Sequence, residues 1–523
     1  MPPTTDNTLF GFHRLAQLYN IRLVQPLRVH SQLGTARRHT VANGQEVRTW
    51  PAQYRPADTF RGHFEFGLKH ERLHFEFFSR LFAYLPAQEV AAWVQNEPTG
   101  SYARRTAFLY EWFTGQRLDV PDTAPNVGYV DAIDAKRYLV AQNPERVRRW
   151  RVNNNLPGLR DFCPLVWLGL EAERGWLYDV AAGVQQLDDT YGTELLLRSA
   201  AWLTLKESRA SFAIEHEADK HDRVQRFAAA MGAFSGQMQD PLLSHNLLTL
   251  QKAVLGESAL RLGIRRSPVF IGQSSLRAQV VHYIAPSEGL VDGMLDALRS
   301  FELRTRGANP VARAAAVSFA FVYLHPLADG NGRIHRFLIN HLLAADKAVP
   351  APIVIPVSAT IAGSAKGRAA YDQVLEVFSR PFMQSHADGY RFGPQRTCPD
   401  GVVTDFVFTQ TQDAEHAWRY PDLTEHVCYL SAVLRKTVEH EMAQEALALR
   451  QHGAARAAIK ILVEMPDQDA DRIIRSLQQS QWTVSNKLRK ELPEIFGEAA
   501  DLSALQAQIV AAVREVFEGG GMD

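Results

Sequence analysis

Apolar side chains recur at intervals of three and four residues over most of the chain, which is the spacing of helices that pack on a core. The pattern predicts helices over Val311 to Leu324 and Arg333 to Leu343, and Asn309-Pro310 is typical of a helix start. Earlier in the chain it predicts helices over Phe64 to Leu81 and Tyr102 to Phe113. The fold is therefore expected to be mainly α.

Strand-like segments are short. Val41 to Val47 contains an Asn-Gly dipeptide, which is typical of a β-hairpin turn. Strand formers within Arg266 to Gly272 are followed by a second apolar run, Ala278 to Ile284, and together these predict another hairpin. Thr404 to Thr409 is predicted to be a short strand or the start of a helix.

Changes in these patterns divide the chain into four regions. Residues 1–160 are predicted to form an α+β accessory region, and residues 161–237 a long helical region. Residues 238–388 form a helical core that includes the second hairpin, and residues 389–523 form a further helical region.

The last region ends in three short helical segments whose lengths suit a helix-turn-helix or winged-helix module. The third of them carries basic side chains, Lys487, Arg489 and Lys490. DNA is therefore a candidate partner, although a plain helical bundle would have the same pattern.

Charge and cysteine content narrow the classes of function. The 523 residues contain 57 Lys and Arg and 57 Asp and Glu, so no global field attracts nucleic acid or an anionic membrane. The three cysteines are widely scattered and fit neither a disulfide framework nor a clustered zinc site. Without an apolar stretch of roughly eighteen residues or a leader-like N-terminus, we expect no membrane association and a cytoplasmic location.

Chemically active residue types gather between the helices predicted at 311–324 and 333–343. Residues 325–336 read HPLADGNGRIHR. A neutral histidine can accept a proton near physiological pH, so His325 is the candidate base. The carboxylate of Asp329 is a ligand type that Mg²⁺ prefers. Such an Asp-Gly-Asn-Gly run also occurs in hairpin turns, but the flanking helices favour a helix–loop–helix arrangement.

The rest of this stretch suits a phosphate. Gly330 and Gly332 allow backbone conformations that direct successive N–H groups towards one point at the start of a helix. Unpaired N–H groups at a helix N-terminus favour phosphate. Arg333 and Arg336 lie one turn apart and could bind the same phosphate group. The stretch therefore predicts phosphoryl or nucleotidyl transfer.

The same twelve residues resemble the signature of the Fic family, His-x-Phe-x-(Asp/Glu)-Gly-Asn-(Gly/Lys)-Arg-x-x-Arg, with Leu327 where phenylalanine is usual. The resemblance implies transfer of AMP from ATP to a Ser, Thr or Tyr hydroxyl of a protein. It implies His325 as the base, Asp329 as the Mg²⁺ ligand and phosphate contacts from the glycine-rich loop and the arginines, namely Gly330, Asn331, Gly332, Arg333 and Arg336. Glycine at 332 favours AMP transfer over transfer of the terminal phosphate.

Two further features follow from this resemblance. The second predicted hairpin, with Val269, Phe270 and Ile271, occupies the place of the family's flap, which pairs with a target segment as an added strand. An ordinary hairpin that covers the core is the alternative. Tyr371 is expected to line the adenine pocket, although a core tyrosine would look the same in sequence.

The segment from Ser211 to His216 resembles the family's inhibitory motif, (Ser/Thr)-x-x-x-Glu-(Gly/Asn), with histidine in the last position. In this form Glu215 would pair with Arg336 and occupy the position that the terminal phosphate of ATP needs. The alternative is a solvated glutamate on a charged helix running from Glu207 to Arg223.

Three functions therefore remain open at this point. The first is an autoinhibited adenylyltransferase that modifies a protein hydroxyl, including its own. The second is a regulatory or DNA-binding protein with a silent Fic core. The third keeps the enzyme but changes the reaction, through another nucleotide donor or removal of AMP from a protein.

Overall fold

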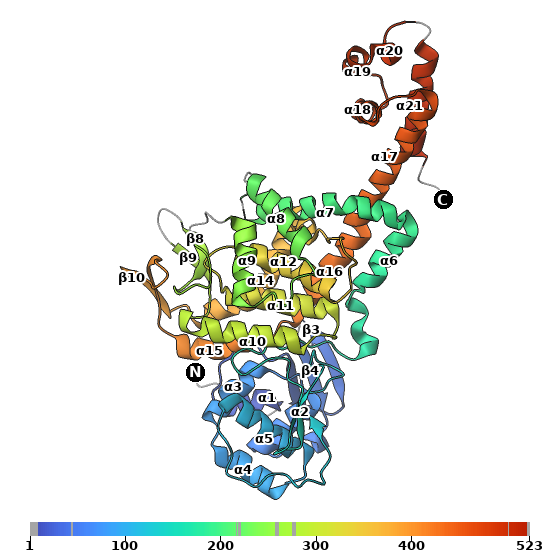
Figure 1. The fold of residues 1–523 in the computed structure, drawn as a ribbon. Helices are drawn as coiled ribbons and strands as arrows, with labels where there is room; N and C mark the ends of the chain where they lie inside the picture. Colours follow the sequence, from blue (N-terminus) through green and yellow to red (C-terminus); the bar gives the residue numbers. More distant parts are fainter. Residues whose placement is uncertain are drawn as a thin grey trace.

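The structure, a computed structural model, describes residues 9–42, 45–215, 217, 221–256, 261–274, 279–499 and 502–519. Figure 1 shows three bodies in a row: an N-terminal region in blue, a central helical region in green to orange, and a small C-terminal module in red on a projecting helix. The mainly α fold expected from the sequence is confirmed. None of the described helices has the length and apolar character needed to cross a membrane.

The N-terminal region combines helices with two small sheets. Its helices are α1 (Phe12–Leu18), α2 (Phe60–His70), α3 (Phe75–Tyr84), α4 (Ala87–Asn96) and α5 (Ser101–Thr114). One sheet has the order β1 (Leu9–Phe10), β2 (Val29–Leu33), β4 (Gln45–Trp50), β3 (Arg38–Ala42), and the other β5 (Val130–Asp131), β7 (Val152–Asn154), β6 (Glu145–Val147). The hairpin predicted at 41–47 is confirmed, since Ala42 lies opposite Gln45, while Asn43 and Gly44 lie outside the described residues.

The single helix predicted over Phe64 to Leu81 is wrong, because the chain breaks between α2 and α3. Hydrogen bonds to distant parts of the chain stabilise the non-helical conformation between the two helices. The carboxylate of Glu71 accepts from the backbone of Phe12 at 2.8 Å, and the backbone N–H of Leu73 donates to the hydroxyl of Tyr138 at 2.8 Å. The ring of His74 then accepts from the first turn of α3 and acts as its N-cap. Apolar periodicity alone does not reveal such a break.

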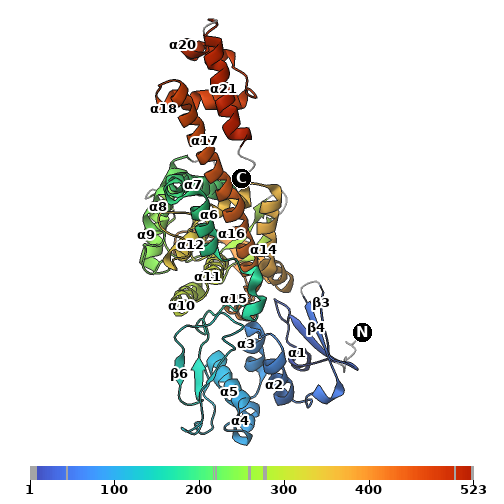
Figure 2. The same cartoon turned by 90° about the vertical axis from the view of Figure 1, so that its right-hand side faces the viewer.

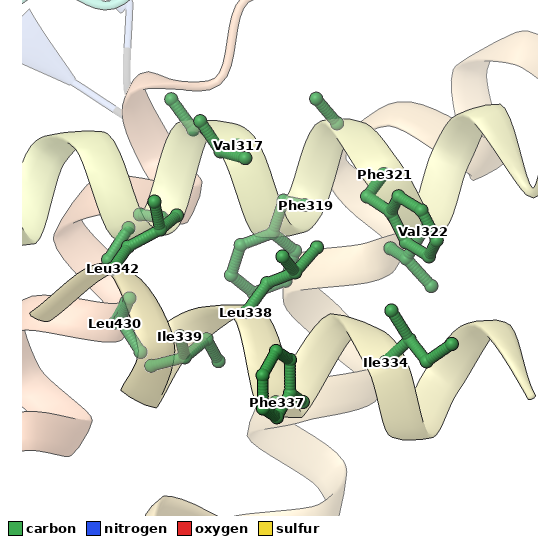
Figure 3. Packing of buried hydrophobic residues seen from close by; sticks show 14 of the residues in the cluster. Val317, Phe319, Phe321, Val322, Ile334, Phe337, Leu338, Ile339, Leu342 and Leu430 are labelled. Atoms are coloured by element: carbon green, nitrogen blue, oxygen red, sulfur yellow. The ribbon is translucent and has the colours of Figure 1, made fainter. Parts of the chain in front are cut away.

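The central region is built around two antiparallel helices, α11 (Pro310–Leu324) and α12 (Asn331–Ala345). Every residue of α11 from Val311 to Leu324 is buried, so this helix is apolar on all sides and forms the centre of the core. Figure 3 shows Phe319 and Val322 of α11 extending towards α12, with Leu338 of α12 next to Phe319. This packing fixes the two helices that flank the loop at 325–330.

Other helices surround this pair. They are α6 (Val180–Tyr191), α7 (Thr193–Ile214), α8 (His221–Phe234), α9 (Ser244–Leu255), α10 (Val291–Arg304), α13 (Val357–Ala362), α14 (Ala365–Ser385), α15 (Thr411–Arg419) and α16 (Thr424–Lys436). Two hairpins lie at one edge of the region: β8 (Phe270–Ser274) with β9 (Gln279–Ile284), and β10 (Tyr390–Thr397) with β11 (Val403–Phe408). The segment that the sequence left open at 404–409 is thus a strand.

A π-helical turn over Thr437–Met442 joins α16 to α17 (Ala443–Leu462), which projects from the central region (Figure 2). The module at its end contains α18 (Asp467–Gln479), α19 (Asn486–Glu491), α20 (Pro493–Phe496) and α21 (Ser503–Glu518). It has a hydrophobic core of its own, to which Ala455 and Ile459 of α17 contribute, whereas Ala446 of α17 belongs to the central core. One helix therefore takes part in two cores.

Candidate active site

The loop between α11 and α12 holds its two ends in left-handed backbone conformations. His325 ends α11 with φ 49°, and Gly330 precedes α12 with φ 86°. A positive φ is uncommon for histidine and costs energy, so it persists only where the surrounding structure enforces it. The two left-handed residues thus mark the end of α11 and the start of α12.

A buried arginine that the sequence analysis did not single out enforces this turn. The guanidinium of Arg265 is fully buried and donates to the carbonyl oxygen of His325 at 2.7 Å and that of Leu324 at 3.3 Å. It also donates to the carbonyls of Ser267 at 2.9 Å and Pro286 at 2.5 Å. These bonds satisfy the carbonyls at the end of α11, which a helix alone leaves unpaired. Nothing in the local sequence distinguishes this arginine from a surface one.

The middle of the loop is closed by amide side chains. Asn331 donates from Nδ2 to the carbonyl of Leu327 at 2.8 Å and accepts at Oδ1 from its N–H at 2.9 Å. Leu327 itself is buried, so leucine retains the anchoring expected of this position. Gln251, also not singled out from sequence, donates to the carbonyl of Asp329 at 2.8 Å and accepts from Gly263 at 2.6 Å. The side chain of Asn331 thus shapes the loop directly.

The imidazole of His325 lies below the surface. Burial, together with the charge of Arg265, lowers the pKa of His325 to about 4. Its Nδ1 lies 3.3 Å from the carbonyl oxygen of Val322, which favours the tautomer with the proton on Nδ1. His325 is therefore neutral at physiological pH, with the lone pair of Nε2 free to accept a proton.

Asp329 and Arg333 lie side by side at the start of α12. The carboxylate of Asp329 is about half exposed, at 49%, and its Oδ1 is 3.0 Å from Nη2 of Arg333. Arg333 also pairs with Glu217 and lies over the ring of Phe212 at 5.2 Å. Among the residues that the structure describes, no group of three or more His, Cys, Asp and Glu side chains gathers to form a metal site.

Arg336 is almost fully buried and meets the end of α7. Its Nε donates to the hydroxyl of Ser211 at 2.7 Å, and its Nη2 donates to the carbonyl of Ser211 at 3.1 Å and to Oε1 of Glu215 at 2.8 Å. Burial raises the pKa of Glu215, but the charge and hydrogen bond of Arg336 outweigh it, and the pKa lies below its ordinary value. Ser211 and Glu215 thus lie against the arginine that the sequence pattern pairs them with.

The helix predicted over Glu207 to Arg223 is wrong in its second half, since α7 ends at Ile214 and α8 begins at His221. Attraction between opposite charges explains the turn, because Glu215 and Glu217 both face arginines of α12. Glu215 is 35% exposed, but it is paired with Arg336 and is therefore not a free, fully solvated glutamate. His216, where the inhibitory motif has glycine or asparagine, lies outside the described residues.

Gly332 leaves room for this carboxylate. A Cβ atom at position 332 would clash with Oε1 of Glu215 and lie 3.4 Å from Nη1 of Arg336. Glycine at this position therefore allows the close approach of the glutamate to the backbone of α12.

A pocket of about 700 Å³ lies between the β8–β9 hairpin, the C-terminal end of α11 and α14. Its walls include Ile271, Val281, Tyr323, Asp372 and Leu375. Tyr371 is buried behind this wall, and burial raises its pKa. Its ring centroid lies 6.3 Å from that of His335 and the same distance from that of Tyr429. Tyr371 thus packs in the core next to the pocket, and its contact with adenine stays a prediction.

The predicted flap is a hairpin, with Ile271 opposite Tyr283. Val269 precedes its first strand and accepts from the backbone of Ala285 at 3.1 Å. Phe270 packs on Phe392 and Phe406 of the β10–β11 hairpin, with ring centroids 5.6 and 4.7 Å apart. Ile271 is 40% exposed. Of the three residues predicted for target positioning, Ile271 offers its side chain to solvent.

Comparisons with known proteins agree with this site. Residues 242–343 match the sequence profile of the Fic/DOC family. The chain is 28% identical over 186 residues to the protein adenylyltransferase Fic of Culex quinquefasciatus, covering 32% of each chain. It is 32% identical over 170 residues to the protein adenylyltransferase fic-1 of Caenorhabditis briggsae, covering 30% of each. The match spans about a third of the length of these curated relatives.

A solved structure of a Fic family protein from Desulfovibrio desulfuricans G20 aligns with a TM-score of 0.35 and 17% identity, over 61% of this chain and 93% of that one. That similarity is too weak to support a conclusion. The family profile and the curated relatives lead to the assignment: this chain contains a Fic/DOC domain, and residues 325–336 lie within it.

Proposed function

We propose that this chain is a protein adenylyltransferase, which transfers AMP from ATP to a Ser, Thr or Tyr hydroxyl of a protein target. The observation that carries the proposal is the arrangement of the 325–336 loop. The loop and the first two turns of α12 carry a neutral, partly buried imidazole, a half-exposed carboxylate, a helix N-terminus and two arginines. Residues 242–343, which include this loop, match the Fic/DOC family, and relatives named adenylyltransferases match about a third of the chain.

In the proposed reaction, Nε2 of His325 takes the proton of the target hydroxyl. The hydroxyl oxygen attacks the α-phosphorus of ATP, the bond from that phosphorus to the bridging oxygen breaks, and pyrophosphate leaves. The backbone N–H groups at Gly332 and Arg333 and the guanidinium of Arg333 stabilise the negative charge on the phosphates. Positioning and charge neutralisation supply most of the rate enhancement.

The residues present suit Mg²⁺ that arrives with ATP. Mg²⁺ is commonly held by one or two carboxylates together with substrate phosphates and water, and Asp329 is a half-exposed carboxylate at the entrance of the loop. Asp329 would hold the ion. When bound, Mg²⁺ would neutralise charge on the phosphates. Before that, the Oδ1 of Asp329 must leave Arg333, which lies 3.0 Å away.

We further propose that Glu215 inhibits the enzyme by occupying the phosphate-binding face of Arg336. The guanidinium is 1% exposed, so it needs an anionic partner at all times. Glu215 supplies one in the resting state, and the terminal phosphate of ATP would supply one in the active state. The two anions compete for the same nitrogen, and ATP can bind productively only when the glutamate leaves.

Removal of the Glu215 side chain tests both statements. In Glu215→Gly, incubation with ATP labelled on the α-phosphate should give at least tenfold more self-modification than the unaltered chain, because Arg336 becomes available. Glu194→Gly, at the other end of the same helix, is the matched control and should leave labelling unchanged. Equal labelling of Glu215→Gly and the unaltered chain would contradict the inhibitory role.

A second substitution separates inhibition from chemistry. Adding His325→Ala to Glu215→Gly should abolish label transfer while the affinity for ATP stays within about twofold, because the imidazole is assigned to the hydroxyl and not to the phosphates. Transfer that persists without His325 would rule out its role as the base. If the protein became labelled by ATP carrying the label on its γ-phosphate and not by ATP carrying it on its α-phosphate, AMP transfer would be ruled out.

A further inference from the structure

The N-terminal region has a charge of its own. Residues 9–165 contain 21 Lys and Arg and 14 Asp and Glu, a net charge of +7, although the whole chain is balanced at 57 of each sign. The remainder of the chain is correspondingly acidic. A local positive field of this kind attracts anions even when the net charge of the protein is zero.

Some of these positively charged side chains line one pocket. A pocket of about 360 Å³ lies between the β3–β4 hairpin and the C-terminal end of α2. Five cationic residues line it, namely Arg37, Arg38, Arg48, Lys69 and Arg137, and of these Arg48 is paired with Glu46 at 2.7 Å. The volume lies at the lower end of the range for small-molecule sites. No carboxylate lines this pocket.

The cationic side chains around the pocket differ in whether they already have a carboxylate partner. Lys69 lies 2.5 Å from Glu65, and Arg137 lies 3.4 Å from Asp134. Arg37 stacks on the ring of Trp50, with its guanidinium carbon 4.7 Å from the ring centroid. Neither Arg37 nor Arg38 has a carboxylate partner among the described residues. Both side chains are exposed, so two guanidinium groups remain available to a ligand.

A buried donor without an acceptor is found in the same wall. Trp50 is 2% exposed, and its indole Nε1–H has no hydrogen-bond partner among the described residues. Buried donors are nearly always paired in native proteins, so an unpaired one calls for an explanation. The positive surroundings also act on His70 in this wall: burial and the charges of Lys69 and Arg37 lower its pKa.

We propose that this pocket binds a small ligand that carries phosphate groups. Arg37 and Arg38 would contact the phosphate oxygens with their planar guanidinium groups, and Lys69 would add a third positive charge. Lys69 also lines a neighbouring groove of about 820 Å³ that contains the half-exposed ring of Tyr54. The organic part of the ligand would lie in that groove. The convergence of charge on one hollow favours a small molecule over a nucleic-acid backbone, which is usually followed by a stripe of basic residues.

Calorimetric titration of the full chain with sodium tripolyphosphate tests the proposal. The chain should bind it in a salt-dependent manner, since surface charges are screened over about 10 Å at 0.1 M salt. Arg37→Ala with Arg38→Ala should weaken binding at least tenfold. Arg22→Ala with Arg117→Ala removes the same charge from exposed positions of the same region, away from the pocket, and should change the affinity less than twofold. Arg336→Ala should leave this binding event in place, which separates it from the Fic/DOC site.

Three results would overturn the proposal. The unaltered chain could fail to bind tripolyphosphate at low salt. The two double variants could lose affinity equally, which would indicate a diffuse charge effect. A single-stranded oligonucleotide of ten thymidines could bind more tightly than tripolyphosphate through the same arginines, which would assign the surface to nucleic acid. Far-UV circular dichroism of both double variants checks that the fold is retained.

Discussion

The imidazole of His325 lies where its charged form is disfavoured. Burial and the guanidinium of Arg265 act in the same direction, whereas Glu215 opposes them weakly through its negative charge. A base with a low pKa is a weaker proton acceptor, but it is fully unprotonated over the physiological range. His325 is thus a weaker base, but its unprotonated form is present over the whole physiological pH range.

This environment predicts the pH dependence of the reaction. In Glu215→Gly, kcat/KM should fall on the acid side with a midpoint near pH 4, because His325 must lose its proton before it can act. Loss of the glutamate removes an anion that raises this pKa, so the midpoint should not move upwards. A profile of kcat/KM against pH from 3.5 to 8 provides the measurement. An acid limb centred at pH 6 to 7 would mean that another group, or an exposed His325, is the base.

Position 332 allows a second test at the scale of one residue. In Gly332→Ala the new methyl group would displace the carboxylate of Glu215, so self-modification should rise above that of the unaltered chain. In a Glu215→Gly background the same alanine has no carboxylate to displace and should give no increase. Labelling of the four proteins of this double-mutant cycle measures the coupling. Equal effects of alanine in both backgrounds would show that the two positions act independently.

Sequence reasoning located the residues that meet the substrate better than those that support them. His325, Asp329 and Arg336 stand in a recognisable order, and the structure places the first two in the loop and the third in helix α12 directly after it. Arg265 and Gln251 hold that loop through backbone carbonyls and N–H groups, which any donor of suitable length could do. Their role depends on burial and position, which a sequence does not display.

At the scale of the element, α7 is fixed by two carboxyl groups. Glu215, at the end of α7, binds α12. About two turns earlier, Glu207 accepts from Ser358 of α13, from the backbone at 2.7 Å and from the hydroxyl at 2.6 Å. Glu207 is fully buried, and burial raises its pKa to about 7 despite these hydrogen bonds. Helix α7 is therefore attached through a carboxyl group whose pKa lies near 7.

The sign of this shift predicts how stability varies with pH. Between pH 4.5 and 7 the unfolded chain ionises Glu207 while the folded chain keeps its proton, so the folded state loses stability as pH rises. The loss approaches about 3 kcal/mol above pH 7, from about 1.4 kcal/mol per pKa unit. Glu207→Gln has no proton to lose, so its thermal midpoint should rise relative to that of the unaltered chain from pH 5 to pH 8. A constant difference between the two midpoints would contradict the raised pKa.

Helix boundaries were the least accurate part of the sequence predictions. The helices predicted over 64–81 and 207–223 were both too long, for the same reason. The breaks after His70 and after Ile214 are set by contacts with distant parts of the chain, Phe12 in one case and the arginines of α12 in the other. The helix α11 was predicted within one residue, because a capping asparagine and a first-turn proline mark its start locally.

At the scale of the whole molecule, the hydrophobic cores define larger units than the motifs do. The central core includes Trp418 and Leu430, which the sequence analysis placed in the C-terminal region, and it ends within α17. The C-terminal module has a separate core. Its basic residues are partly neutralised, with Lys487 3.8 Å from Glu491 and Arg472 3.7 Å from the same side chain. DNA binding by the module stays a prediction.

Separate cores predict separate unfolding. Ile474 is fully buried in the C-terminal module, so Ile474→Ala should cost that module about 2 to 5 kcal/mol and lower one calorimetric transition only. Ile461→Ala, at a residue of α17 that is 84% exposed, is the control and should shift no transition. A single transition that moves as a whole in Ile474→Ala would show that the module and the central region unfold as one unit.

The space that Gly332 leaves empty has a consequence for the evolution of this protein. A side chain at 332 clashes with the carboxylate of Glu215 while that glutamate is present, and the clash disappears once the glutamate is gone. The order of mutations therefore matters, and the two positions are expected to vary together among descendants of this chain. A lineage that loses Glu215 would also be free to change residue 332, which is proposed to border the phosphates. Loss of the proposed inhibition could therefore precede a change in the reaction.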